Sequence, residues 1–453
     1  MLFLKKKTNA VDSHLYELIK QLRFSSVGFY FVSFLIPIIS FLNLDISGLQ
    51  LGFVFSLRTI GFTCSALIAG FLSNRRELRP KLIFGASTGR FVSYILIYFA
   101  FVFNLYWMMV VGMLILGIGV GFFWIPFRTT VADATEYEHR SEAFGIFSQQ
   151  SGIGGFVGAT MGFTILWTSY SVSLPSELIY SLIGFSPLIL YGISNIYAGI
   201  RVLQLTPKIK FIDILETDER KKHAKKWIFY SFVVLLCILF IEALIGSLVD
   251  SFMEFFLLEN ITQDIVMIMI AYIPGGVLSV IIAPRLGRIA DKLNPKYTLG
   301  AISALGAIMT WLLIQSTQIW QFSLIFLVDT TVVATAGLML TKIISTVSKE
   351  RRGTIFGSQD FVSNIGNIIG PVMGGALWDA ALYTPFLPEI GGIANSMSTR
   401  ERWHANHNLP FIVSIIVEGC LAIMYPIAII ILGKNIDIKG NKNEEKNKMG
   451  DLS

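Results

Sequence analysis

Long apolar segments dominate this 453-residue chain and limit it to very few folds. A helix needs about 20 apolar residues to cross the hydrocarbon core of a bilayer. Segments of this kind recur along almost the whole chain, and they are continuous runs rather than the alternating pattern of barrel strands. We therefore expect an all-α membrane protein with twelve transmembrane helices, at residues 24–44, 47–72, 80–102, 104–133, 142–168, 178–203, 227–258, 262–285, 298–316, 320–347, 353–380 and 409–433.

The composition supports a membrane location. Hydrophobic residues make up 54% of the chain, charged residues only 15%, and the mean hydropathy is +0.65. Soluble domains carry about 25% charged residues. The chain therefore has too little charge to cover a water-facing surface, and we expect the lipid bilayer to cover it instead.

The placement of Lys and Arg predicts the orientation. Most of the 36 basic residues fall in the two tails and in alternate connections, whereas the long segment 381–408 holds only Arg400 and Arg402. Basic connections stay on the cytoplasmic side of a membrane. We expect a multi-pass protein of the plasma membrane with both termini in the cytoplasm. Because the cations are spread over many connections, the net charge of +6 does not indicate nucleic-acid binding.

An internal repeat divides the chain into two halves. Residues 138–162 and 350–374 share ten identical residues without a gap, including Arg140 with Arg352 and one Phe-Gly dipeptide, 144–145 with 356–357. The fifth predicted helix therefore corresponds to the eleventh, and six helices repeat as six. The expected organisation is a cytoplasmic segment 1–23, a six-helix bundle 24–203, a cytoplasmic linker 204–226, a second six-helix bundle 227–433 and a disordered cytoplasmic tail 434–453.

Several short motifs occur in a fixed order around this repeat. The connection after the second helix reads GFLSNRRELR (70–79), and its counterpart in the second half reads GRIADKLNPK (287–296). The fourth helix has glycines spaced by two in 117–121, and the eleventh has G-P-x-x-G-G in 370–375. With the six-plus-six repeat, the chain resembles the major facilitator superfamily over nearly its whole length. The resemblance implies two pseudo-symmetric six-helix bundles that rock about a central site to move a small solute.

The resemblance also implies a cytoplasmic gate or latch between the bundles. An acid at the fifth position of the basic connection can sit at the positive N-terminus of a helix in the other half, a contact worth about 0.3–1 kcal/mol. By the repeat, we expect Asp291 near 141–143, and Asn74 near 353–355. The expected gate residues are Asn74, Arg75, Asp133, Arg140, Asp291 and Arg352.

Charged residues inside the predicted spans are the candidate transport site, because each costs about 2.5–3.5 kcal/mol to insert. In the first half they are cationic and in the second half mainly anionic. Asp250 and Asp329 lie at similar depths on two helices that line the cavity in this family, so we expect them to meet there and to carry a proton. Arg58 is placed to hold an anionic substrate or to pair with an acid. The candidates are Arg58, Arg128, Glu242, Asp250, Glu254 and Asp329.

Three functions are consistent with these residues. The main hypothesis is gradient-coupled secondary active transport of a small organic solute, with anions among the candidate solutes and with protons or another coupling ion. The alternatives are proton-coupled efflux of amphipathic, drug-like compounds, and a non-transporting receptor or sensor. Met113 occupies the position where proton-coupled members often have arginine, which weighs against drug efflux. We find no enzyme motif, and we expect a monomer without cofactor, metal or nucleic acid.

Overall fold

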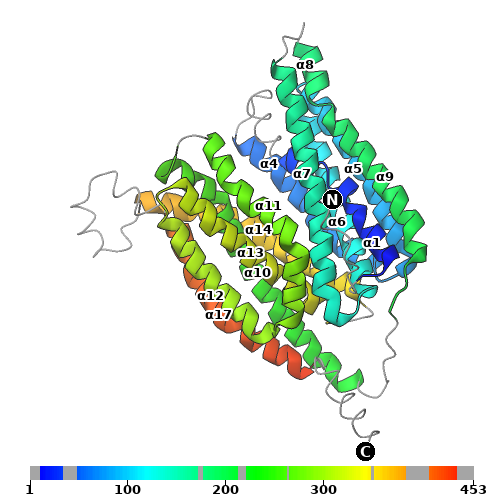
Figure 1. The fold of residues 1–453 in the computed structure, drawn as a ribbon, viewed down its shortest axis with the longest axis vertical. Coiled ribbons are helices and arrows are strands. Elements are labelled where there is room, and N and C mark those ends of the chain that lie inside the picture. The colour runs from blue at the N-terminus through cyan, green and yellow to red at the C-terminus, as the bar shows by residue number, and fades with distance from the viewer. Residues whose placement is uncertain are drawn as a thin grey trace, which may run out of the picture.

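The computed structural model describes residues 11–33, 48–171, 177–212, 221–262, 265–347, 351–383 and 408–435, and helices make up most of them (Figure 1). The first half contains α1 (Ser13–Lys20), α2 (Leu22–Ser25), α4 (Gly48–Leu72), α5 (Arg79–Val102), α6 (Tyr106–Asp133), α7 (Arg140–Ser171), α8 (Glu177–Gly184) and α9 (Pro187–Leu205). The second half contains α10 (Lys221–Asn260), α11 (Ile265–Lys292), α12 (Pro295–Ile314), α13 (Ile319–Ile344), α14 (Arg352–Tyr383) and α17 (Leu409–Asn435). Short 3₁₀ turns occupy Arg76–Leu78, Tyr137–His139 and Thr206–Lys208.

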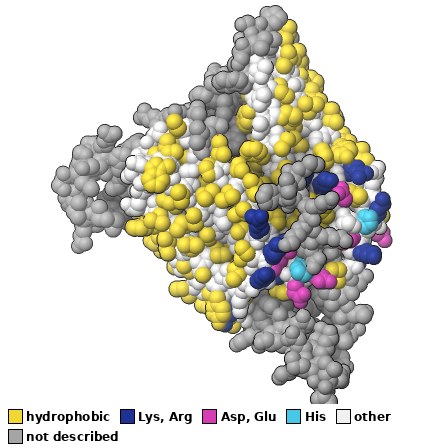
Figure 2. Space-filling view, in the orientation of Figure 1, with side chains coloured by type: hydrophobic (Ala, Val, Ile, Leu, Met, Phe, Trp, Pro, Cys, Tyr) yellow, Lys and Arg dark blue, Asp and Glu magenta, His cyan; other side chains and the backbone are white. Residues whose placement is uncertain are grey.

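The helices present an apolar surface, as a bilayer requires. Within lipid, every backbone N–H and C=O group has to be bonded inside the protein, and a helix achieves this within one segment. Eight of the helices in the described ranges are long and apolar enough to cross a membrane. Large apolar side chains such as Phe71, Trp107 and Val372 are exposed on the helix surfaces. Figure 2 shows hydrophobic side chains over most of the visible face and charged side chains gathered at one end.

The helices form two groups that follow the sequence repeat. In the first half α5 packs on α6 and α9, and α4 packs on α6; in the second half α10 packs on α14, α12 on α17, and α11 on α13. The halves meet mainly along two crossings, α7 with α11 and α4 with α14. Since α7 and α14 are equivalent by the repeat, the two crossings are copies of one contact. This is the arrangement that the repeat predicts for the fifth and eleventh helices.

Glycines allow the two crossings to form. A Cβ atom added to Gly357 of α14 would lie 2.5 Å from the carbonyl oxygen of Ala66 and 2.9 Å from the Cα of Gly70, both in α4. A Cβ atom on Gly145 of α7 would lie 2.9 Å from the Cα of Pro284 in α11. Real side chains do not tolerate such distances to backbone, so the helices approach this closely only because these positions lack a side chain.

The crossings lie toward one end of the molecule, which we call the closed face. It carries the connections between α4 and α5, α6 and α7, α11 and α12, and α13 and α14. We call the other end the opposite face; it carries the short connection 103–105 between α5 and α6. Helix α1 lies within the predicted segment 1–23, buries Leu15, Leu18 and Ile19, and packs on α7 and α9.

Three predicted segments differ from the structure. The first, 24–44, is not one helix from its start, because α2 ends at Ser25 and residues 26–28 form a turn; residues 34–47 lie outside the described ranges. The sixth, 178–203, is interrupted after Gly184, and α9 restarts with Pro187, whose ring and missing N–H disfavour a helix interior. Helix α10 begins at Lys221, inside the predicted linker. The predicted disordered tail lies almost wholly outside the described residues.

The glycine crossings predict a sharp effect of one added side chain. We expect Gly357→Val to disfavour the closed face, because overpacking against backbone costs about 1–3 kcal/mol, or about 5- to 150-fold in population. Double electron–electron resonance between labels at Lys81 and Tyr297, one on each half of the closed face, measures the separation. The native cysteines Cys64, Cys237 and Cys420 are exposed and have to be replaced first.

Gly85→Val is the matched control, because nothing lies within 4 Å of a Cβ atom at that position. It should leave the distance distribution as in the parent protein. An unchanged distribution in Gly357→Val would show that the α4–α14 crossing does not hold the closed face together.

Candidate functional site

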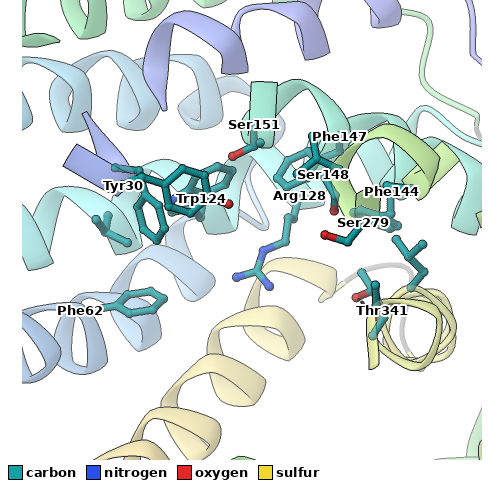
Figure 3. A pocket seen from close by; sticks show the side chains of 18 of the residues that line it. Tyr30, Phe62, Trp124, Arg128, Phe144, Phe147, Ser148, Ser151, Ser279 and Thr341 are labelled. Atoms are coloured by element: carbon teal, nitrogen blue, oxygen red, sulfur yellow. Dashed lines mark hydrogen bonds between the residues drawn. The ribbon is translucent and has the colours of Figure 1, made fainter. Parts of the chain in front are cut away.

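A cavity of about 750 Å³ lies between the two halves. Helices α4, α6 and α7 contribute one wall, and α11, α13 and α14 contribute the other (Figure 3). Its lining combines aromatic rings with a small number of polar groups. The aromatic residues are Phe29, Tyr30, Phe62, Trp124, Phe144 and Phe147, and the polar ones are Arg58, Thr59, Arg128, Ser148, Ser151, Ser279, Thr341, Asn364 and Asn367.

Arg58 and Arg128, two of the candidates predicted from the sequence, both line this cavity. Their surroundings differ. The Arg58 guanidinium lies 5.7 Å from the centroid of the Phe29 ring and has no carboxylate partner within the described ranges. The Arg128 guanidinium forms an ion pair with Asp360 of α14 and lies 5.6 Å from the Phe356 ring centroid. Arg58 is therefore the cation of the cavity whose charge is not already compensated by a described carboxylate.

The candidate acids lie elsewhere. Asp250 and Asp329 are close enough to interact electrostatically, as expected, but neither lines the cavity. Glu242 accepts a hydrogen bond from the Tyr425 hydroxyl at 2.5 Å, and Glu418 also interacts with Asp329. Both acids belong to the second half, Asp250 on α10 and Asp329 on α13. Their expected role in carrying a proton stays a prediction. The Glu254 side chain lies outside what the structure describes.

Asp291 makes the contact that the repeat predicts. Its two carboxylate oxygens accept hydrogen bonds from the backbone N–H groups of Ser141, at 3.1 Å, and Glu142, at 2.8 Å. These are free N–H groups in the first turn of α7, where the helix dipole favours negative charge. Asp291 also pairs with the buried Lys342, whose Nζ lies 2.7 Å from it.

Asn74 makes the equivalent contact with a neutral side chain. Its Oδ1 accepts a hydrogen bond from the Thr354 N–H at 3.2 Å, and its Nδ2 donates to the Thr354 hydroxyl at 2.7 Å. Thr354 is the repeat equivalent of Glu142, so both crossings are fastened at the same helical position. The neighbouring Arg75 is exposed and has no ion pair within the described part of the chain.

Asp133 is the most heavily contacted acid of the closed face. Its carboxylate is 4% exposed, forms ion pairs with Arg352 and, at 2.7 Å, with Arg79, and lies 3.8 Å from Arg76. Arg352 also donates to the backbone oxygen of Ala132 at 3.1 Å. The pair between Asp133 and Arg352 joins α6 to α14, so it is a contact between the halves.

Arg140 forms no ion pair with a carboxylate within the described ranges. It donates to the hydroxyl of Ser345 and to the backbone oxygen of Thr135, both at 3.1 Å. Its ring neighbour Tyr137 lies in the 3₁₀ turn before α7, where burial raises the pKa of the phenol and the Arg140 charge opposes this. Arg140 thus also bridges the halves, through Ser345.

Sequence reasoning missed some of these residues and left others without a partner. Glu142 binds Arg288 at 2.6 Å across the α7–α11 crossing. Its equivalent in the second half is Thr354, so the repeat gave no signal of that role. Asp360 and Lys342 were visible as intramembrane charges, but their partners lie 232 and 51 residues away.

The start of the linker is attached to the closed face of the first half. The backbone N–H of Ile212 donates to the backbone oxygen of Asp133 at 3.1 Å. The Arg76 guanidinium lies 5.0 Å from the centroid of the Phe211 ring. The segment that joins the two bundles is therefore bound, at its start, to Asp133, the residue that also pairs with Arg352 and Arg79.

Comparison with known proteins agrees with this architecture. The sequence profile of the Major Facilitator Superfamily matches residues 24–371. The chain is 22% identical over 370 residues to "Multidrug resistance protein 2" of Bacillus subtilis (strain 168), covering 80% of this chain and 88% of that protein. It is 29% identical over 162 residues to "Tetracycline resistance protein, class H" of Pasteurella multocida, covering 35% of this chain and only 40% of that protein.

Among solved structures, the fold is similar to that of FucP in the outward conformation. The TM-score is 0.63 at 13% identity, and the match covers 91% of this chain and 98% of FucP. At this identity the likeness concerns the fold alone. The repeat, the two glycine crossings, the cavity between the halves and the profile match lead to one conclusion: the chain belongs to the Major Facilitator Superfamily and is a multi-pass membrane transporter.

Proposed function

We propose that this transporter carries a small amphipathic organic anion across the plasma membrane by alternating access. The observation that carries the proposal is Arg58, a cation in an aromatic cavity without a described carboxylate partner. A charged group within the membrane is costly unless it is paired or faces a ligand. An anionic group of the solute would supply the missing partner.

The rest of the cavity fits the apolar part of such a solute. A volume of about 750 Å³ lies within the range of about 300–1,000 Å³ that small-molecule sites occupy. The rings of Phe62, Trp124 and Phe147 offer flat apolar surfaces. The hydroxyl groups of Ser148, Ser151 and Ser279 can orient a bound solute.

Efflux of cationic or neutral amphipathic compounds is the competing function, because the curated relatives are named for drug resistance. A cationic solute would require an available carboxylate in the cavity. No carboxylate is among the described residues that line the cavity, and Asp360, which contacts the lining residue Arg128, is already paired with it. The geometry therefore favours an anion.

Alternating access requires the closed face to open. We propose that the gate consists of the contacts between the halves that involve Asp133 with Arg352, Arg140 with Ser345, Asp291 with the start of α7, and Asn74 with Thr354. The positive-inside distribution of Lys and Arg supports the further proposal that the closed face is cytoplasmic. In this state the cavity would then be screened from the cytoplasm.

The Arg58 proposal predicts a charge-selective loss of transport. The assay is uptake of 2-naphthoate into proteoliposomes with an imposed pH gradient. Arg58→Gln should lower the apparent affinity for 2-naphthoate about 10- to 150-fold, because a hydrogen bond to a charged group contributes about 1.5–3 kcal/mol. Arg58→Lys should restore part of it. The matched probes 2-naphthamide and 2-naphthylmethylammonium separate charge from ring binding.

Arg201→Gln, on α9 and outside the cavity lining, controls for the loss of one arginine and should transport like the parent protein. Transport of the ammonium probe in preference to 2-naphthoate would refute the anion proposal and support the competing function.

If the closed face is cytoplasmic, cysteines placed on the two faces should differ in their access to a maleimide added outside the cell. In a cysteine-free background, Phe103→Cys on the opposite face should react in whole cells with a maleimide that does not cross membranes. Glu77→Cys on the closed face should react only after the membrane is permeabilised. Both side chains are exposed, so access depends on the side of the membrane. The reverse pattern would show an inverted topology.

The two latch contacts predict opposite shifts of the gate. Asn74→Asp adds a charge at the start of α14, worth about 0.3–1 kcal/mol, and should increase the closed population about two- to fivefold. Asp291→Asn should open the closed face by more, because it also leaves Lys342 buried without its partner. Labels at Lys81 and Tyr297 report both populations by double electron–electron resonance.

Glu77→Gln removes a charge from the same connection without touching α14 and should leave the populations unchanged. If Asn74→Asp opens the closed face instead, the helix-start contact is not a latch.

A further inference from the structure

The ion pair between Arg128 and Asp360 crosses from one half to the other at the floor of the cavity. Arg128 belongs to α6 and lines the cavity, and its side chain is 17% exposed, whereas that of Asp360 on α14 is 9% exposed. Asp133 lies five residues farther along α6, or about 7.5 Å at the rise of a helix. The pair therefore separates the cavity from the contacts of the closed face.

Two buried hydrogen-bond donors belong to residues that line this part of the cavity. The Nε of Arg128 and the Nδ2 of Asn364 are buried and have no hydrogen-bond partner among the residues that the structure describes. Both residues line the cavity, and Asn364, which is 7% exposed, lies four residues from Asp360 and thus on the same side of α14. Figure 3 shows the Arg128 side chain extending from its helix into the cavity. Two unsatisfied donors from opposite halves call for an acceptor between them.

Arg128 is held in place by more than its partner. Its guanidinium lies 5.6 Å from the centroid of the Phe356 ring, and the fully buried Phe356 packs against Phe144 of α7 with 6.2 Å between centroids. A cation over an aromatic face is stabilised by the ring quadrupole. Phe356 and Asp360 lie four residues apart on α14, so the ring still contacts Arg128 when only the bond to the carboxylate is exchanged, and it moves away when α14 moves.

We propose that Arg128 exchanges partners during transport, binding Asp360 when the cavity is empty and the anionic group of the solute when it reaches the floor. The proposal rests on the proposed function and adds a second, deeper anion position beyond Arg58. When the solute occupies Arg128, Asp360 is released and α14 loses its cavity-side tie to α6. Occupancy of the cavity is thereby linked to opening of the closed face, and the linkage is reciprocal.

The test is the binding of 2-naphthoate to the purified transporter in lipid nanodiscs, measured by titration calorimetry. Asp360→Asn removes the internal competitor, so 2-naphthoate should bind at least about fivefold more tightly, within the usual range of coupling between sites. Arg128→Asp with Asp360→Arg rebuilds the pair in reverse; it should keep the closed face as in the parent protein and lose tight binding.

Glu142→Gln is the matched control, because it breaks another ion pair between the halves, with Arg288, without freeing Arg128. If it tightens binding as much as Asp360→Asn does, the gain comes from the gate alone and the exchange is overturned. Unchanged or weaker binding in Asp360→Asn overturns the exchange as well, while the loss of binding in Arg58→Gln would leave the proposed function standing.

Two further outcomes complete the test. If the parent protein binds 2-naphthylmethylammonium but not 2-naphthoate, the proposed function and the exchange both fail. If Asp360→Asn does not give folded protein, the reversed pair decides, and tight binding of 2-naphthoate by it overturns the proposal.

Discussion

Backbone-to-backbone contact between the two halves is the constraint on which the rest of the structure depends. At the α4–α14 and α7–α11 crossings, glycines such as Gly357 and Gly145 bring main chains together without intervening side chains. Lipid offers no hydrophobic drive for helices to associate, so close packing has to supply it. The crossings bring the helix starts of α7 and α14 within reach of Asp291 and Asn74, and the cavity is the space left beyond them.

The charges of the closed face are suited to a contact that has to break. Asp133 is buried between Arg79 and Arg352, and removing one member of a buried pair is far more costly than removing both. When the halves separate, water can form hydrogen bonds with the charged groups in place of their ionic partners. An apolar contact has no such replacement in water. The ionic contacts therefore give the closed state a defined geometry while leaving a hydrated alternative available to each group.

Much of this architecture could be predicted from the sequence, because the repeat relates distant positions. It placed Asp291 at the start of α7 and Asn74 at the start of α14, and both contacts are present. The positions of Asp250 and Asp329 along their helices predicted that the two acids interact. Position along a helix does not determine whether a side chain points into the cavity. The partnership of Arg128 with Asp360 could not be predicted, since ion pairs between the halves leave no local spacing. The break before Pro187 did carry a local signal, the proline itself.

The anchoring of Ile212 to Asp133 has a mechanical consequence. One end of the connection between the halves is fixed to α6, and the other continues into α10 at Lys221. Ile212 and Lys221 are nine residue steps apart, so the chain between them can span at most about 30–32 Å even when fully extended, at about 3.3–3.6 Å per residue. This tether sets an upper limit to how far the two anchor points can move apart. A shortened tether would act as a mechanical stop on the rocking motion, whatever the solute.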